Sequence, residues 1–405
     1  MMRCHIAQML RAQKRHVSFH TPGHKRAGAD ITELSYSDDL SDPTGVIALA
    51  QADAARILGA DASFFLTDGS TCGIYCMLFA LRRAGAARIA VPTYAHKSVF
   101  HACEALGLQA VLIAQTYVRG IPAQPSAQAV ADALERADAL LLTSPDYYGF
   151  FPPLREARAL CDGAGKPLAV DGAHGSHLHG TPAYAGNFAD LWVDGVHKSL
   201  PALTQGAVVS AIGAWTERLA EAADYFRTSS PSYPILASVE YAVKYPANAR
   251  IERAAARAKV ELGAMDNADW TKIVLAFGDR SDAAQAYFER RGVYPEFNDG
   301  NYLMFYLSPA TRERELKKLV RLARTLPRGE LVFSASSAGM VGGKTVLLPP
   351  DGAVGRTCAR ACGMVPPCVP LIAAGEVVTA EAAARLKRAR HTFGLTDGKI
   401  TVYGE

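Results

Sequence analysis

Short apolar segments alternate with helical segments between about residues 63 and 213 of the chain. The apolar segments lie at 63–67, 88–92, 109–114, 139–144, 167–171, 189–194 and 206–213. Nearly continuous apolar runs of this length are typical of strands that are covered on both faces. Because helical stretches separate them, the pattern predicts an α/β fold with a mostly parallel sheet between two layers of helices.

The pattern changes after about residue 250. Helical stretches are predicted at 251–265, 281–291 and 311–324, and apolar strands at 272–277 and 302–307. A tail punctuated by glycine and proline follows, and the whole segment indicates a smaller α+β domain. We therefore expect an N-terminal arm at 1–35, a large domain at 36–250 and a small C-terminal domain at 251–405.

Composition excludes several classes of protein. The 405 residues are 49% hydrophobic and 20% charged, the balance of an ordinary globular protein. A net charge of +4 is too small to indicate a nucleic-acid surface. No apolar run approaches the roughly 18 residues that a membrane helix needs, and the N-terminal residues contain no continuous apolar segment of a secretion signal. We expect a cytoplasmic protein with neither membrane nor nucleic acid as a partner.

The cysteines and histidines do not predict a metal site. Eight cysteines are spread along the chain, which favours reduced thiols over a disulfide framework. Three of them lie between 358 and 368, but their spacing fits no common zinc motif. Asp171 and the three histidines between 174 and 179 also match no common metal motif, so we expect no metal.

Polar residues follow several of the predicted strands. DGST at 68–71 joins a strand to a helix, and its backbone N–H groups and hydroxyls suit a phosphate. An ordinary helix N-cap explains the same residues. His96 begins the helix after the next strand, where a polar residue at a helix start is the simpler explanation. Neither motif alone identifies a site.

Two further strand ends carry an acid and a base. Asp171 ends an apolar strand, and an acidic group buried there needs a cationic partner to stay ionised. Lys198 lies in a tight turn between two apolar strands, where packing gives little reason for a charge. A partly desolvated lysine suits Schiff-base chemistry, although a surface lysine would explain this residue taken alone.

Together the four motifs supply the parts that pyridoxal 5'-phosphate requires. Ligands bind sheets of this kind at the carboxyl ends of the strands, where all four motifs are expected to lie. The acid would pair with the pyridinium nitrogen, and the lysine would hold the aldehyde. The sequence therefore predicts a site for pyridoxal phosphate.

Segments that cover most of the chain resemble the Orn/Lys/Arg decarboxylase family in a short form. These are pyridoxal-phosphate-dependent enzymes of the aspartate-aminotransferase fold (fold type I). The segments are FHTPGHKRAG (19–28), DITEL (30–34), DDLSDPTGVI (38–47), AQADAARILGADASFFLTDGSTCGI (50–74), VPTYAHKSV (91–99), SPDYYG (144–149), VDGAHGSHL (170–178), HKSLPALTQGAVV (197–209), RTSSPSYPILASVE (227–240) and PPCVPLIAAGEVVT (366–379).

The resemblance implies roles for individual residues. Lys198 would form the aldimine with the cofactor, Asp171 would bind the pyridine nitrogen, and His96 would stack on the ring. His197 would serve proton transfer near the α-carbon, so these four are the implied catalytic residues. The implied cofactor-binding residues are Gly69, Ser70, Thr71, His96, Asp171, Ala173, His174, His197 and Lys198.

The implied reaction is decarboxylation of arginine, lysine or ornithine to the corresponding amine, as in polyamine biosynthesis. The family also implies a homodimer or a larger homo-oligomer. Two alternatives stay open: another reaction of the fold, such as transamination or lyase chemistry, and a homologue that binds the cofactor without turnover. No single residue can be assigned to the substrate's basic end; candidates in family-like segments are Glu33, Asp38, Asp39 and Glu376.

The chain departs from the family pattern beside the cofactor motifs. Gly172 stands where the family usually has glutamate, and Gly195–Val196 where it usually has a hydroxyl pair. Thr93–Tyr94 replaces a usual Arg-Asn, and Cys368 replaces a usual glycine. The aldimine residues are retained, so these changes bear on substrate identity and rate.

Overall fold

The computed structural model describes residues 3–14, 16–26, 30–114, 117–331, 345–365, 368, 370–372 and 374–404. Parts of the family-like segments at 19–28 and 366–379 therefore lie outside the described residues. All nine residues predicted to bind the cofactor are among those described.

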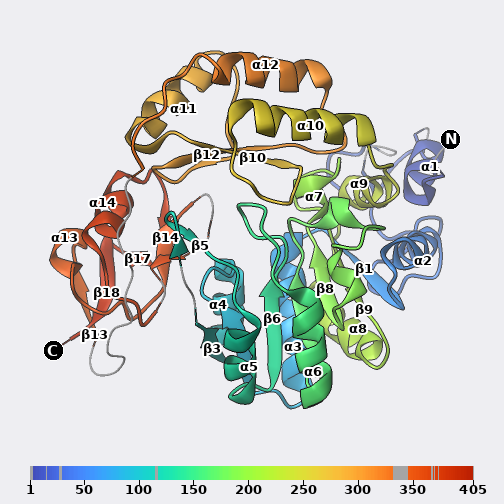
Figure 1. The fold of residues 1–405 in the computed structure, drawn as a ribbon. Helices are drawn as coiled ribbons and strands as arrows, with labels where there is room; N and C mark the ends of the chain where they lie inside the picture. The colour runs from blue at the N-terminus through green and yellow to red at the C-terminus, as the bar shows by residue number, and fades with distance from the viewer. Residues whose placement is uncertain are drawn as a thin grey trace.

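A seven-stranded sheet forms the centre of the large domain (Figure 1). In spatial order its strands are β1 (Ala62–Leu66), β9 (Ala207–Ala211), β8 (Leu191–Asp194), β7 (Leu168–Asp171), β6 (Ala139–Thr143), β2 (Arg88–Pro92) and β3 (Gln109–Ile113). Each predicted apolar segment is confirmed as a strand. The pairs from β8 to β3 are parallel, whereas β9 runs antiparallel to both of its neighbours. The chain between β8 and β9 holds only the short helix α7 (Val196–Ser199), without the long helix that usually makes a parallel crossover.

Helices cover both faces of this sheet. They are α2 (Val46–Leu58), α3 (Gly69–Arg83), α4 (Lys97–Ala105), α5 (Ala127–Glu135), α6 (Leu154–Ala164), α8 (Trp215–Phe226) and α9 (Tyr233–Val243). Strand β6 shows why these strands are apolar throughout. Its Leu140 and Leu142 join the cluster under α2, α5, α6 and α9, while Ala139 and Leu141 join the cluster under α3, α4 and α8. Both sets of side chains are buried, so polar residues are confined to the strand ends.

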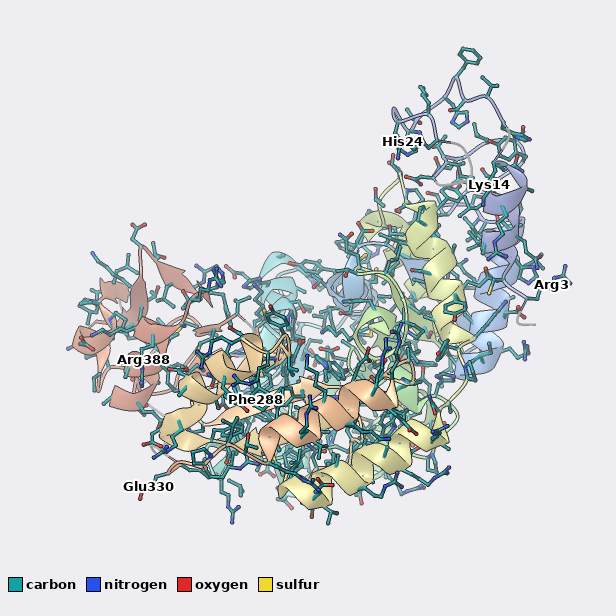
Figure 2. All side chains as sticks on the ribbon, turned by 90° about the horizontal axis from the view of Figure 1, so that it is seen from above. Arg3, Lys14, His24, Phe288, Glu330 and Arg388 are labelled. Carbon is teal, nitrogen blue, oxygen red and sulfur yellow. The ribbon has the colours of Figure 1, made fainter. Side chains whose placement is uncertain are left out.

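The N-terminal arm begins with a helix that belongs to the main core. Helix α1 (His5–Ala12) packs against α9 and α2, and its first backbone N–H groups donate to the carboxylate of Glu240. Beyond α1, the chain around His24 projects from the body of the molecule (Figure 2). Val17 and Phe19 in this projecting part are 80% and 94% exposed. The arm thus combines a docked helix with an apolar surface exposed to solvent.

A second, antiparallel sheet follows the large domain, in the order β10 (Lys272–Ala276), β12 (Tyr302–Tyr306) and β11 (Phe297–Asn298). Helices α10 (Ala249–Leu262), α11 (Ser281–Glu289) and α12 (Glu313–Ala323) pack on this sheet and enclose their own hydrophobic cluster. The strands and helices predicted after residue 250 are confirmed here. On its other face, the sheet contacts the large domain through the hairpin β4 (Tyr117–Val118) and β5 (Ile121–Pro122).

The last part of the chain forms a further cluster around α14 (Ala380–Arg388) and α13 (Pro350–Ala353). Its strands are β13 (Thr345–Leu348), β14 (Cys362–Met364), β15 (Pro370–Ile372), β16 (Thr392–Phe393), β17 (Leu395–Thr396) and β18 (Lys399–Tyr403). Short 3-10 helices lie at Ser176–Leu178, Ala185–Asn187 and Gly278–Arg280. In the described part of residues 251–405, the helices on the second sheet and the elements around α14 thus enclose separate hydrophobic clusters. The division into three domains stays a proposal.

Candidate active site

A small pocket lies where the strands of the large sheet end. Its described lining residues are Ser70, Tyr94, His96, Ser98, Thr143, Tyr147, Asp171, Ala173, His174 and Lys198. Several of them end or closely follow strands β1, β2, β6, β7 and β8, so parallel packing brings distant parts of the sequence together at one edge. Ser70, His96, Asp171, Ala173, His174 and Lys198 were expected at a cofactor site.

Lys198 lies on α7 and points its amine into this pocket. Its Nζ is 3.2 Å from Nε2 of His174. Burial lowers the pKa of Lys198, while the carboxylates of Asp171 and Glu296 act in the opposite direction. A lysine whose pKa is lowered keeps a larger neutral fraction, and the neutral amine is the form that reacts with an aldehyde.

Asp171 ends β7 and is only 4% exposed. The backbone N–H of Ala173 donates to its Oδ1 at 3.1 Å. Burial raises the pKa of Asp171, and the Lys198 ammonium opposes that shift. A buried carboxyl with so few partners is stabilised in its ionised form by a cation, which a protonated pyridine nitrogen would supply.

His96 has two roles in the geometry. Its Nδ1 accepts a hydrogen bond from the backbone N–H of Ser98 at 3.2 Å and so caps α4, which confirms the simpler interpretation. The same ring lines the pocket with Lys198. Burial lowers the pKa of His96 to about 3, so the ring is neutral at physiological pH. A neutral, fixed ring is suited to stacking on an aromatic cofactor.

Only part of the DGST motif at 68–71, predicted to bind phosphate, lines the pocket. Ser70 lines it at the first turn of the 15-residue helix α3, where the helix dipole favours an anion. Gly69 precedes it with a φ of +76°, a left-handed conformation that glycine adopts readily, and donates its N–H to the carbonyl of Gln205. Thr71 is exposed and is not among the described lining residues.

His197 also lies outside the described lining residues, although it is adjacent to Lys198. Its Nδ1 is 2.8 Å from the carbonyl oxygen of Gly206, so this nitrogen carries the proton and donates it. Burial lowers the pKa of His197. Its role in proton transfer therefore stays a prediction, with Nε2 as the ring nitrogen left for it.

Two aromatic rings hold His174 in place. Tyr147 packs edge-on against it with ring centroids 4.7 Å apart, and Tyr306 stacks on it at 5.8 Å. Burial lowers the pKa of His174 well below its ordinary value. Its Nδ1 and the hydroxyl of Thr143 are buried without a partner in the described part of the chain. Buried polar atoms normally have a hydrogen-bond partner, which a polar group bound in the pocket would supply. The pocket residues are therefore compatible with a polar aromatic cofactor.

Sequence reasoning missed four lining residues: Tyr94, Ser98, Thr143 and Tyr147. Thr143 ends β6, and Tyr94 follows β2 by two residues. The rule that strand ends carry the site would have found these two. Tyr147 lies in a family-like segment, but its local sequence gives no sign that it reaches the lysine.

Two of the departures from the family pattern have a steric explanation. A Cβ at Gly195 would lie 2.6 Å from the carbonyl oxygen of Ala173, and one at Gly172 would lie 2.9 Å from that of Val193. The ends of β7 and β8 are packed too closely for side chains at these positions. The family's usual hydroxyl and glutamate are therefore absent at two positions where the backbones after β7 and β8 lie in close contact.

A family model described as "Orn/Lys/Arg decarboxylase, major domain" matches residues 27–272, more than half of the chain. The chain belongs to the Orn/Lys/Arg decarboxylase family. The resemblance seen in the sequence is confirmed, and membership makes the chain an amino-acid decarboxylase.

Curated relatives agree with this membership of the Orn/Lys/Arg decarboxylase family. The chain is 30% identical to the uncharacterized protein YaaO of Bacillus subtilis (strain 168), over 93% of this chain and 92% of that protein. It is 27% identical to an arginine decarboxylase of Halalkalibacterium halodurans, over 90% and 88% of the two chains.

Solved structures confirm the fold. The constitutive lysine decarboxylase of E. coli superimposes with a TM-score of 0.73 at 18% identity, over 99% of this chain and 82% of that chain. The lysine decarboxylase LdcF of Francisella novicida gives 0.76 at 16% identity, over 98% and 80%. A serine palmitoyltransferase structure with pyridoxal phosphate gives 0.56 at 14% identity, over 69% of this chain and 75% of that one. The large domain therefore has the predicted fold type I.

Among the described residues, no helix combines the length and apolar character needed to cross a bilayer. The same residues contain no group of three or more His, Cys, Asp or Glu side chains placed to hold a metal ion.

Proposed function

We propose that the chain binds pyridoxal 5'-phosphate at Lys198 and decarboxylates a basic amino acid (arginine, lysine or ornithine) to the corresponding amine. The observation that carries the proposal is that a buried carboxyl, Asp171, and the partly buried amine of Lys198 line one pocket at the strand ends. Membership of the Orn/Lys/Arg decarboxylase family supports the reaction class.

Each side of the cofactor has a residue that suits it. Lys198 would hold the aldehyde carbon, Asp171 the ring nitrogen, and Ser70 at the start of α3 the phosphate. His96 would cover one face of the ring. When bound, the cofactor supplies an electron sink that accepts the electron pair left by the departing carboxyl group.

The chain's own residues prepare this chemistry. Burial keeps part of the Lys198 population neutral, so the amine can exchange with the substrate's amino group. Asp171 would hold the ring nitrogen in its protonated form when the cofactor is bound, because a buried carboxylate needs a cation beside it. We assign the return of a proton to the α-carbon to His197, whose Nδ1 is committed to the carbonyl of Gly206.

Purified protein incubated with pyridoxal phosphate should absorb in the visible region, and borohydride should then fix the cofactor covalently to Lys198. Carbon dioxide release from arginine, lysine and ornithine, measured in parallel, identifies the substrate. Keto-acid formation without carbon dioxide would instead show a transaminase. Cofactor uptake without turnover of any amino acid would show a homologue that only binds it, and a protein that takes up no cofactor would refute the proposal.

We further propose a homodimer or larger homo-oligomer in the cytoplasm. The projecting part of the arm supports self-association, because Val17 and Phe19 expose apolar surface there. Light scattering of the intact protein should give a mass of at least twice 43.2 kDa. Replacement of both residues by serine should lower that mass, and a monomeric intact protein would contradict the assignment.

A further inference from the structure

Tyr306 ends β12 of the second sheet and reaches the active site of the large domain. Alternate residues of this strand, Tyr302, Met304 and Tyr306, pack toward the large domain, because side chains alternate between the two faces of a strand. The ring of Tyr306 stacks on the imidazole of His174, with centroids 5.8 Å apart and 20° between the ring planes. Its hydroxyl donates to the backbone carbonyl of His174 at 3.3 Å. One side chain therefore contacts both the ring and the backbone of His174.

The register of the second sheet places a buried cation over the Tyr306 ring. Lys272 on β10 is the antiparallel partner of Tyr306, and its Nζ lies 4.7 Å from the centroid of the ring. Lys272 is fully buried and forms an ion pair with Asp269, which also contacts His177 at 3.0 Å. An ammonium over an aromatic face attracts the ring. Tyr306 is thus held by its cross-strand neighbour as well as by His174.

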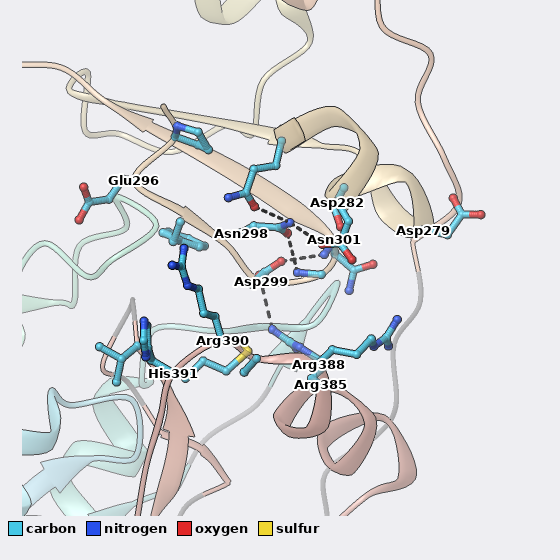
Figure 3. A pocket seen from close by; sticks show the side chains of 18 of the residues that line it. Asp279, Asp282, Glu296, Asn298, Asp299, Asn301, Arg385, Arg388, Arg390 and His391 are labelled. Carbon is cyan, nitrogen blue, oxygen red and sulfur yellow. Dashed lines mark hydrogen bonds and ion pairs between the residues drawn. The ribbon is translucent and has the colours of Figure 1, made fainter. Parts of the chain in front are cut away.

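Strand β12 is also fixed at its other end. In the turn between β11 and β12, Asp299 accepts hydrogen bonds from the backbone N–H groups of Asn301 and Tyr302 at 2.8 and 2.7 Å. The same carboxylate faces Arg385 at 4.0 Å across the groove between the second sheet and α14 (Figure 3). A side chain on a strand that is anchored in this way has a well-defined position, so Tyr306 is a rigid support.

His174 carries this placement to the reactive amine. The imidazole is 5% exposed, and its Nε2 lies 3.2 Å from Nζ of Lys198. An ammonium has only donors, so Nε2 accepts when Lys198 is charged. Tyr306 and Lys272 are not among the described lining residues of the pocket. They therefore act on the amine through His174 and not by contact with a bound molecule.

We infer that Tyr306 is a positioning residue for Lys198: by stacking on His174, it holds the imidazole where Nε2 meets the Lys198 amine. The inference rests on the proposed function, in which this amine reacts with the cofactor's aldehyde. Without the Tyr306 ring, His174 keeps the edge-on contact with Tyr147 but loses its stacked partner. We expect the imidazole then to turn away from the amine, which loses its fixed orientation.

Tyr302 provides a matched control for the packing of the second sheet. It lies four residues earlier on β12, on the same face, and is 3% exposed. Its hydroxyl donates to the carbonyl of Arg119, in the turn between β4 and β5, at 3.0 Å. Tyr302→Leu therefore removes a buried ring and a hydrogen bond to a backbone carbonyl, as Tyr306→Leu does. Only the change at Tyr306 removes the ring stacked on His174.

The first measurement is the rate of cofactor uptake, followed by visible absorbance after full-length protein freed of cofactor is mixed with pyridoxal phosphate. Tyr306→Leu should lower this rate by roughly 10- to 100-fold, the effect of misplacing a reacting group by about 1 Å. Tyr306→Phe keeps the stacked ring and should recover most of the rate, whereas Tyr302→Leu should match the unaltered protein. An unchanged rate in Tyr306→Leu, or equal slowing in Tyr302→Leu, would overturn the inference.

Chemical modification of His174 separates this inference from the proposed function. Diethylpyrocarbonate modifies accessible neutral imidazoles, and mass spectrometry locates the modified residue. His174 should react several-fold faster in Tyr306→Leu than in the unaltered protein, Tyr306→Phe or Tyr302→Leu. The comparison needs no cofactor, so a protein that takes up no pyridoxal phosphate would refute the proposed function and leave this test intact.

Equal modification of His174 in Tyr306→Leu and the unaltered protein would overturn the inference. Far-UV circular dichroism should show that all variants are folded. If Tyr306→Leu is not, Tyr306→Met gives the same comparison, because a methionine fills irregular space without supplying a ring.

Discussion

The side-chain nitrogen of Lys198 lies 3.2 Å from Nε2 of His174, although the two residues come from different strand ends. Both groups have lowered pKa values because they are buried, so the contact need not join two cations. His174 is fixed in turn by two aromatic rings, Tyr147 after β6 and Tyr306 at the end of β12. The reactive amine is therefore positioned by residues of both the large domain and the second sheet.

Replacement of Lys198 by alanine should abolish turnover, with a loss of at least about 1,000-fold in kcat, because no other amine is held in the pocket in the described part of the chain. Far-UV circular dichroism should be unchanged. Lys317→Ala, which removes an exposed lysine on α12, is the control and should retain full activity. Retained turnover in Lys198→Ala would refute the assignment.

Restoring the hydroxyl that the family usually has at position 195 should harm the protein. In Gly195→Ser the new Cβ would meet the carbonyl oxygen of Ala173 at 2.6 Å, so the ends of β7 and β8 would have to separate. We expect a loss of about 1–3 kcal/mol in the free energy of unfolding and weaker cofactor binding. Gly163→Ser, with nothing within 4 Å of its Cβ, is the matched control. Tighter cofactor binding in Gly195→Ser would contradict this account.

A buried ion cluster joins the large domain to the second sheet. Asp269 contacts His177 at 3.0 Å and forms an ion pair with Lys272, and all three side chains are fully buried. Burial alone would raise the pKa of Asp269, but Lys272 and His177 lower it. Asp269→Ala leaves the ammonium of Lys272 buried without its carboxylate partner. The variant should therefore lose about 3–5 kcal/mol of unfolding free energy, measured with urea.

The double variant Asp269→Ala with Lys272→Met also removes the unpaired ammonium. It should recover part of the unfolding free energy that Asp269→Ala loses. Glu313→Ala, which breaks the exposed ion pair with Arg250, should have little effect by comparison. Equal losses of unfolding free energy in Asp269→Ala and Glu313→Ala would show that burial does not make the Asp269 cluster more important for stability than an exposed ion pair.

Asp194 should make stability depend on pH. It ends β8, accepts a hydrogen bond from the hydroxyl of Tyr184, and burial raises its pKa to about 7. Between about pH 4 and 7 the folded protein holds a proton that the unfolded chain releases, so stability falls as pH rises through this window. The slope from this residue is at most roughly 1.4 kcal/mol per pH unit.

Asp194→Asn removes this titration while keeping the shape of the side chain. Relative to the unaltered protein, the variant should become more stable as pH rises from 5 to 7.5, as followed by urea midpoints. Contributions of other groups, such as Asp146 with a pKa raised to about 6, are common to both proteins and cancel. A difference that stays constant with pH would contradict the raised pKa of Asp194.

Cys368 occupies a backbone conformation that suits glycine. Its φ is +63°, and its N–H and carbonyl are held by Met364 and Lys97. A side chain in the left-handed region costs about 1 kcal/mol. Cys368→Gly should therefore leave thermal stability unchanged or raise it slightly, whereas the β-branched Cys368→Val should lower it. A marked loss in the glycine variant would show that the thiol itself stabilises this turn.

The sequence by itself determined the positions of the central strands and the family. Buried strands such as β6 are apolar at every position because both faces are covered, and this pattern is visible without a structure. Two residues proposed to carry the chemistry lie at or near the ends of such strands: Asp171 ends β7, and Lys198 lies in the short helix after β8. The local sequence therefore points to them as well. Family motifs are also local strings of residues, which made the membership recognisable.

The tertiary structure alone decided which side chains meet. Tyr147 reaches both the lysine pocket and Glu296, yet those contacts join segments 149 residues apart. The sequence also offered Asp38 as a candidate for the substrate, although the fold uses its carboxylate to cap the start of α2. Periodicity reports which face of an element is buried. It does not report what that face packs against, because the partners are chosen by contacts between elements far apart in the chain.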